Sequence, residues 1–242
     1  MARAGAPAIA AVAALLPTLA HAQGDPGLLF DPDTLSARSV QIFLLITVLS
    51  LAPAIAIMIT CFPFIVTVLS ILRQAIGLQQ APPNMLIVSL ALFLTYFVMD
   101  PVLTEAWERG VAPFLDGNLS LEAGVAAALE PFRGFMAARL DPDTFARMAA
   151  LRELPEATVP RDSALSVLVP SFMLSEIARA FEIGFLIFLP FLVIDLVVAA
   201  ILMSMGMMMV PPAIVSLPFK LAFFVVADGW SLLSDSLVRS YM

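Results

Sequence analysis

The sequence has few of the residues on which most enzymes and metal sites depend. Among its 242 residues there is one cysteine, Cys61, and one histidine, His21. A single cysteine excludes an intrachain disulfide and any metal site built from several cysteines. Charged residues make up only 13% of the chain and the net charge is −7. This balance argues against nucleic-acid binding, which needs a basic face.

Apolar residues dominate instead. They account for 61% of the chain, and the mean hydropathy is +1.00. A soluble domain is typically about half apolar and about a quarter charged. We therefore predict an all-α membrane protein with about four apolar helical segments, interrupted by prolines and arranged as helical hairpins.

Residues 1–22 have the features of a cleaved signal peptide. Arg3 precedes a short apolar core, and the sequence AHA before Gln23 fits the small-residue cleavage rule. Cleavage after Ala22 would remove the only histidine; an uncleaved first anchor is the alternative. Residues 23–39 are rich in proline and aspartate and are predicted to form a loop-like leader.

The first pair of apolar segments is predicted at residues 40–103. Residues 40–72 contain no charge, and as one straight helix they would rise about 50 Å at 1.5 Å per residue. The hydrocarbon core of a bilayer is about 30 Å thick. The helix must therefore overshoot the bilayer or break at Pro53 and Pro63. A broken helix at membrane depth needs protein or water around it, which indicates an assembly.

The second segment of this pair begins after a polar turn and reads NMLIVSLALFLTYFVM. We expect Asp100 and Pro101 to end it. Residues 104–163 are then predicted to be a water-facing, periplasmic insert of short helices, because about half of the acidic and half of the basic residues lie there.

Within the insert, the sequence PDTFARMAALREL has an amphipathic helical pattern. This pattern places Phe145, Met148 and Leu151 on one face.

A second pair of apolar segments is predicted at residues 164–242, joined by a methionine-rich turn at 203–212. In a plain four-span arrangement after signal cleavage, the leader and the insert lie outside. The 73–83 turn and the methionine-rich turn then lie on the cytoplasmic side. The segments are too long and too rich in proline for simple anchors, so this arrangement describes the sequence and not necessarily the assembled protein.

Several charges lie inside the apolar segments, where an unpaired ionisable group costs about 3 kcal/mol or more. Glu176 and Arg179 can pair as i and i+3 on one helix. Asp195 and Lys220 have no partner of opposite sign nearby in the sequence. They need one from another element or another subunit, or else a water-filled path such as a proton site. We favour a partner in another subunit.

Residues 203–209 contain five of the 13 methionines: Met203, Met205, Met207, Met208 and Met209. Such residues can be plain filler facing lipid or the core. Methionine is also used where a surface must adapt to many shapes. Gly206 and the pair Pro211 and Pro212 interrupt regular helix here, so a simple lipid-exposed span is excluded. A deformable hydrophobic seal around a pore is the alternative.

No catalytic constellation is visible. The mature chain would have no histidine, it has no cysteine pair and no glycine-rich phosphate loop. We predict that the protein is not an enzyme and that it binds no cofactor and no metal.

Three long stretches are distinctive: VLSILRQAIGLQQAPPN, LALFLTYFVMDPV and IGFLIFLPFLVIDLVVAAILMSMGMMMVPPAIVSLPFKLAFFVVADGW. They resemble the FliP family of flagellar export-gate proteins, which has a counterpart in virulence injectisomes. The resemblance covers about residues 40–238 and is weakest in the insert.

The resemblance implies a ring, usually of five copies, with FliQ-like and FliR-like membrane partners and other export-gate proteins. This ring would pass unfolded flagellar subunits across the bacterial inner membrane at the flagellar basal body. The family's methionine gasket falls on Met207, Met208 and Met209. Its intersubunit ion pair falls on Glu176 and Lys220. Much of the assembly would rise above the bilayer, which explains overlong helices.

One position departs from the family pattern. Where the family usually reads TSFxRI, this chain has TCFPFI. Phe64 stands at the position of the arginine, and a proline, Pro63, stands before it. The role of that arginine cannot be transferred. A small-molecule or ion transporter and a purely structural membrane scaffold remain rival interpretations, although the internal repeats common in transporters are not apparent.

Overall fold

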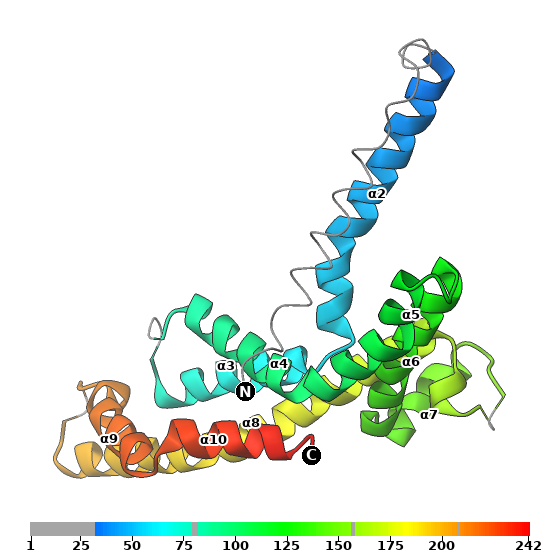
Figure 1. The fold of residues 1–242 in the computed structure, drawn as a ribbon. Coiled ribbons are helices and arrows are strands. Elements are labelled where there is room, and N and C mark those ends of the chain that lie inside the picture. The colour runs from blue at the N-terminus through cyan, green and yellow to red at the C-terminus, as the bar shows by residue number, and fades with distance from the viewer. Residues whose placement is uncertain (1–31, 79–81, 156–157, 208) are drawn as a thin grey trace, which may run out of the picture. The chain divides into compact units, whose positions relative to one another are not determined.

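The computed structural model describes residues 32–78, 82–155, 158–207 and 209–242 (Figure 1). All regular elements in these ranges are helical, which confirms the all-α prediction. The predicted signal peptide and residues 23–31 of the leader lie outside the described residues.

The chain divides into two compact units, Met1–Pro53 and Ala54–Met242. The described part of the first unit is the beginning of helix α2, which runs over Pro32–Met58. The prediction of a loop-like leader is therefore wrong for residues 32–39. Proline is favoured in the first turn of a helix because its missing N–H would have no partner there.

The long charge-free segment breaks at one of its two prolines. Helix α2 continues through Pro53 and ends at Met58. Helix α3, Phe62–Ile76, then begins with Pro63 in its first turn. Pro63 has no N–H to donate to a preceding turn, which is costly inside a helix but costs nothing in the first turn, so Pro63 suits the start of α3. Pro53 lies inside an apolar helix, where ending the helix would leave several backbone groups unpaired instead of one.

The second apolar segment does not stop at Asp100 and Pro101, and this prediction is wrong. Helix α4, Asn84–Ala106, includes both residues. It continues through a π-helical stretch η3, Trp107–Val111, into helix α5, Ala112–Leu115. The continuous stretch Asn84–Leu115 has 32 residues and is apolar enough to span a membrane.

The insert contains helices α6, Leu121–Arg139, and α7, Pro142–Ala150, followed by the single turn η4, Pro160–Asp162. The prediction of helices is confirmed, and the amphipathic one is α7. Phe145 is buried and Met148 packs against the same cluster. Leu151 is 78% exposed, so its placement on this face is wrong, because α7 ends one residue before it.

The last third of the unit is a long hairpin followed by a bend. Helix α8, Leu165–Ser204, has 40 residues and contains Pro170 and Pro190. At 1.5 Å per residue it rises about 60 Å, twice the thickness of a hydrocarbon core. Helix α9, Pro212–Val226, returns along it, and helix α10, Gly229–Arg239, follows after a bend of 62°.

The sequence predicts about four apolar segments, and the described chain has two or three helical stretches long enough to span a membrane. Two stretches of the described chain, Asn84–Leu115 and Leu165–Ser204, are long and apolar enough to cross a membrane. The bent pair of α9 and α10 makes a third if it counts as one span.

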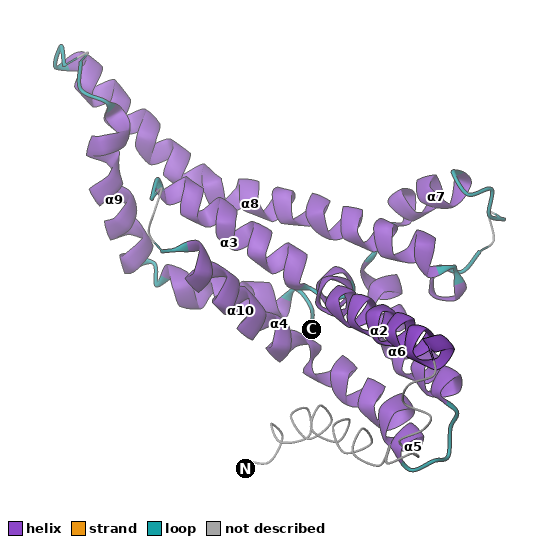
Figure 2. Cartoon of the chain, turned by 90° about the horizontal axis from the view of Figure 1, so that it is seen from above, coloured by secondary structure: helices purple, strands orange, loops and turns teal. Residues whose placement is uncertain are grey.

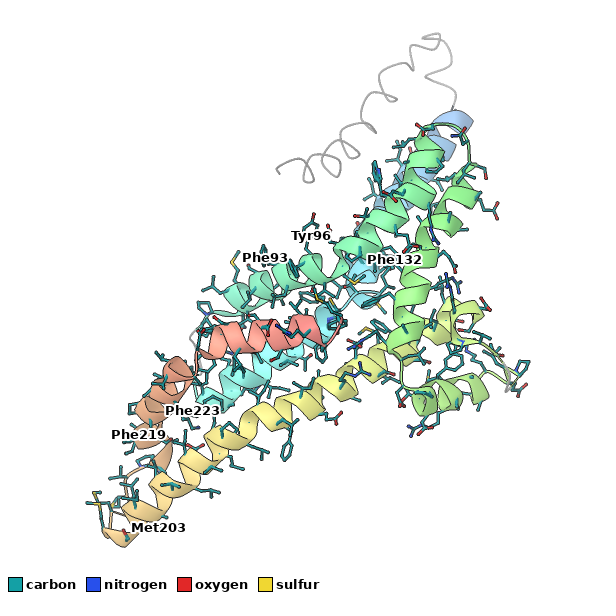
Figure 3. All side chains as sticks on the ribbon, turned by 60° about the horizontal axis from the view of Figure 1, so that its bottom comes forward. Phe93, Tyr96, Phe132, Met203, Phe219 and Phe223 are labelled. Atoms are coloured by element: carbon teal, nitrogen blue, oxygen red, sulfur yellow. The ribbon has the colours of Figure 1, made fainter. Side chains whose placement is uncertain are left out.

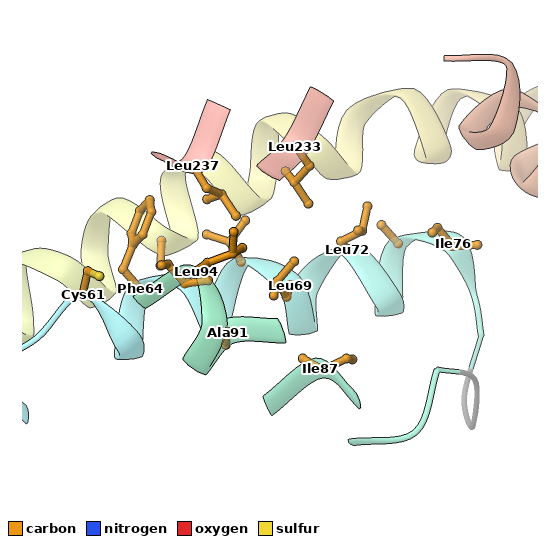
Figure 4. Packing of buried hydrophobic residues seen from close by; sticks show 14 of the residues in the cluster. Cys61, Phe64, Leu69, Leu72, Ile76, Ile87, Ala91, Leu94, Leu233 and Leu237 are labelled. Atoms are coloured by element: carbon orange, nitrogen blue, oxygen red, sulfur yellow. The ribbon is translucent and has the colours of Figure 1, made fainter. Parts of the chain in front are cut away.

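The core of the second unit forms where α3 lies against α4, α8 and α10 (Figure 4). Gly184 on α8 permits the close approach of α3, because a Cβ atom there would lie 2.4 Å from Cδ1 of Ile71. A second cluster joins α6 and α7 to the beginning of α8. Helices α7 and α9 thus lie at opposite ends of α8 (Figure 2). The insert is anchored at one end of this helix and the methionine-rich turn is at the other.

Candidate functional site

The turn between α8 and α9 has a defined backbone geometry. Gly206 adopts a left-handed conformation with φ of 74°. Its N–H donates to the carbonyl of Met203 at 3.0 Å, and the N–H of Met207 donates to the carbonyl of Leu202 at 3.0 Å. These two bonds form a Schellman motif, the usual way for a glycine to end a helix. Pro212 then begins α9 in a position that suits proline.

The described methionines of this turn lie on the surface, and Figure 3 shows Met203 at the end of the hairpin. Met203, Met205 and Met207 are 60%, 65% and 38% exposed. Met209 is 97% exposed, and Met208 lies outside the described residues. The core-filler alternative is therefore wrong for the four described methionines. Their side chains are thus directed to surroundings outside the chain.

Lys220 of α9 lies in a buried polar cluster with partners from two other helices. Its Nζ donates to Oδ2 of Asp195 on α8 at 2.6 Å and to the backbone carbonyl of Ala75 on α3 at 3.0 Å. The hydroxyl of Ser216 donates to Oδ1 of Asp195 at 2.6 Å. Lys220 is 5% exposed. The partner that Asp195 and Lys220 require therefore comes from another element of the same chain, and the subunit that we favoured as its source is not needed.

Glu176 of α8 is fully buried and lies in a second polar cluster. Its Oε1 accepts a hydrogen bond from Nε of Arg139 on α6 at 3.2 Å, and its Oε2 accepts one from the hydroxyl of Tyr241. Within the described residues its ion-pair partner is Arg139, so the alternative of a pair with Arg179 is wrong.

Arg139 also fixes the C-terminal residues of the chain. Its Nη1 donates to the carbonyl of Ser240 at 2.6 Å, and its guanidinium lies 4.0 Å from the centre of the Tyr241 ring. The Tyr241 ring stacks on Phe135 of α6 and meets the edge of Phe64 of α3. Burial, with the nearby charge of Glu176, raises the pKa of Tyr241 well above its usual value. The hydroxyl therefore remains a hydrogen-bond donor.

Sequence reasoning missed Arg139, Ser216 and Tyr241. Arg139 and Tyr241 lie 37 and 65 positions from Glu176, so no local pattern connects them. A weak signal was present, because Tyr241 is one of only two tyrosines.

No group of three or more metal-ligating side chains is found among the described residues. Phe64, at the position where the family usually has arginine, is fully buried in the core. An apolar side chain there packs against Tyr241.

A family model described as FliP family matches residues 45–237. The chain belongs to the FliP family. It is 50% identical over 235 residues to a flagellar biosynthetic protein FliP of Caulobacter vibrioides, covering 96% of this chain and 88% of that protein. A FliP protein of Agrobacterium fabrum is 50% identical, with 96% of each chain covered. One of Bacillus subtilis is 44% identical, with 87% of this chain and 95% of that protein covered.

The resemblance seen in the sequence motifs is thus confirmed. Membership of the FliP family makes the chain a flagellar biosynthetic protein, and its long apolar helices fit a membrane protein. The methionine gasket and the intersubunit pair of Glu176 with Lys220 stay predictions. Glu176 and Lys220 each have an ion-pair partner within the chain. A contact between them across subunits requires at least one of these two ion pairs to open or to accept a further charged partner.

Proposed function

We propose that the chain is a core component of the flagellar type III protein export gate in the bacterial inner membrane. Copies of the chain, five in the usual arrangement, form a ring at the flagellar basal body with FliQ-like and FliR-like partners. The ring surrounds the passage through which unfolded flagellar subunits leave the cytoplasm. Membership of the FliP family supports the assignment to flagellar export.

The observation that carries the pore proposal is the exposure of the methionine turn. In a ring, the turns of neighbouring copies meet at Met207, Met208 and Met209. Flexible thioether side chains close on one another, exclude water and hydrated ions, and then deform around a passing chain. The Schellman motif at Gly206 supports this arrangement because it gives the turn a fixed backbone from which mobile side chains project.

In this proposal the subunit supplies a passage, and the proposal needs neither a cofactor nor an enzyme activity. We retain the intersubunit pair of Glu176 with Lys220 as part of the proposal, in addition to the pairs within the chain.

Replacing Met207, Met208 and Met209 together by alanine is expected to leave ring assembly intact and to make the membrane leaky to ions. Alanine removes the flexible side chains that close the constriction but keeps the Gly206 turn. The measurement is ion conductance of the assembled complex in a planar bilayer, with assembly checked on a native gel.

The matched control is the triple replacement of Met85, Leu86 and Phe93 on α4 by alanine. These residues are also exposed and apolar, at 80%, 59% and 67%, but lie outside the turn. Its conductance should equal that of the wild type. A gasket variant that assembles and conducts no more than wild type would contradict the pore proposal.

A further inference from the structure

We propose that Asp195, Lys220 and Ser216 position the methionine turn by holding the two arms of the hairpin at a single polar contact, here called the polar pin. The inference rests on the proposed function, because the turn matters as the closing element of the pore. The polar pin would explain why the methionine turn lies where it does.

The polar pin connects three helices at one side chain. The carbonyl of Ala75 is in the last turn of α3, where backbone carbonyls have no partner within the helix. The ammonium group of Lys220 satisfies this carbonyl and complements the negative end of the helix dipole. The same group pairs with Asp195 at 2.6 Å. Lys220 therefore connects α9 to both α3 and α8.

The two arms extend almost equally beyond the polar pin. Ser204, at the end of α8, lies nine positions after Asp195, and Pro212, at the start of α9, lies eight positions before Lys220. At 1.5 Å per residue these lengths are about 14 Å and about 12 Å. A small change of angle at the pin is thus carried to the methionine turn by two helical arms of similar length.

Packing between the arms differs on the two sides of the polar pin. On the side away from the turn, Phe191 of α8 is 2% exposed and contacts Phe223 and Phe224 of α9, with ring centres 5.9 and 6.5 Å apart. On α9, Phe223 belongs to this base, and Phe219 lies nearer the turn (Figure 3). The base of the hairpin is therefore held by interlocking aromatic rings.

An apolar groove of about 390 Å³ runs along the two arms past the polar pin toward the turn. Its walls include Val197 and Ile201 of α8 and Val215 of α9. In the described part of the hairpin, every side-chain hydrogen bond between α8 and α9 involves Asp195. Among the described residues, the polar pin is thus the side-chain hydrogen-bonding contact that joins the arms between the aromatic base and the turn.

An ion pair with a buried lysine is suited to this task. Separating the pair leaves the charge of Lys220, which is 5% exposed, uncompensated in the interior, so arrangements that separate Asp195 from Lys220 are disfavoured. An apolar contact at the same place would permit sliding. The geometry therefore gives the tip of the hairpin room to adapt while its mean position stays fixed.

The test is a distance measurement by electron paramagnetic resonance in the assembled complex. Spin labels are attached after the substitutions Met203→Cys and Ile214→Cys, at exposed positions on opposite arms. Buried Cys61 is replaced by alanine, and labelled copies are diluted with unlabelled ones to isolate distances within one chain. In the Asp195→Asn variant we expect a longer mean distance, a broader distribution and a higher ion conductance.

Leu196→Ala is the matched control, since Leu196 is the next residue, 62% exposed and not part of the groove. It should leave the distances unchanged. Should Asp195→Asn fail to assemble, Ser216→Ala removes one hydrogen bond and keeps the ion pair; it should give a smaller broadening in the same direction.

The outcomes separate this inference from the proposed function. An unchanged distance distribution in Asp195→Asn, or in Ser216→Ala if that variant is used, overturns the polar pin whatever the conductance. A broader distribution with wild-type conductance also overturns it, provided that the triple methionine variant leaks. If neither the pin variant nor the triple methionine variant leaks, the proposed pore role fails while the control of the turn by the pin stands.

Discussion

Replacing Arg139 by methionine is expected to lower the free energy of unfolding by about 3 to 5 kcal/mol, the usual cost of breaking a buried ion pair from one side. Glu176 is fully buried and would keep only the Tyr241 hydroxyl as a partner. The carbonyl of Ser240 and the face of the Tyr241 ring would also lose their contact with the guanidinium. Unfolding in mixed detergent micelles, followed by the fluorescence of the two tryptophans, gives the measurement.

Arg239→Met is the matched control, because Arg239 pairs with Asp235 at 2.7 Å on the surface, with the two side chains 75% and 60% exposed. Exposed pairs contribute about 0 to 1 kcal/mol. The combined variant Arg139→Met, Glu176→Leu and Tyr241→Phe removes the whole buried polar cluster and should recover most of the lost stability. An Arg139→Met protein as stable as the Arg239→Met protein would contradict this account of Glu176.

Replacing Lys220 by methionine is expected to cause two separable losses. Within the chain, Asp195 and the carbonyl of Ala75 lose their partner, so the free energy of unfolding should fall. The fall should be smaller than the cost of about 3 to 5 kcal/mol for a fully buried pair, because the Asp195 side chain is 33% exposed. Between chains, the proposed contact with Glu176 is lost, so less ring should survive on a native gel.

Two double-mutant cycles assign these losses to their partners. For unfolding, Lys220→Met and Asp195→Asn should couple strongly, because the two side chains form one ion pair. For ring assembly, Lys220→Met and Glu176→Gln should couple by about 1.5 kcal/mol or more, as close charge pairs across interfaces do. Additive effects in the second cycle would remove the intersubunit pair from the proposal and leave the polar pin intact.

The sequence was sufficient for features with local causes. The excess of apolar residues predicts a helical membrane protein, and the amphipathic pattern predicts α7. Gly206 and the prolines after it predict a break in the helix, which the structure places between Ser204 and Pro212. Each of these features depends on residues within a few turns of one another.

Proline was the least reliable local signal. Pro63 separates two helices, whereas Pro53 and Pro101 lie inside continuous ones. One missing hydrogen bond is a smaller cost than a helix end in apolar surroundings. The neighbouring helices determine which of these two costs is larger at a given proline. Because the fold brings these helices together, the sequence near the proline does not show whether the helix ends there.

The partners of the buried charges could not be predicted from the sequence, because they lie far away along the chain. Lys220 and Ala75 are 145 positions apart, and Arg139 reaches Ser240 across 101 positions. A low-charge sequence shows that such groups must be paired, and the structure shows that these partners come from segments far away in the chain.

The central claim is that the methionine turn lines the passage for exported chains. Its most direct test replaces Met209 by a photo-crosslinking residue in cells that contain a stalled export substrate, with Phe185 on the exposed side of α8 as the comparison position. The account predicts that position 209, which is 97% exposed in the single chain, crosslinks to the substrate and position 185 does not. Crosslinks from position 209 to lipid, with none to the substrate, would contradict it.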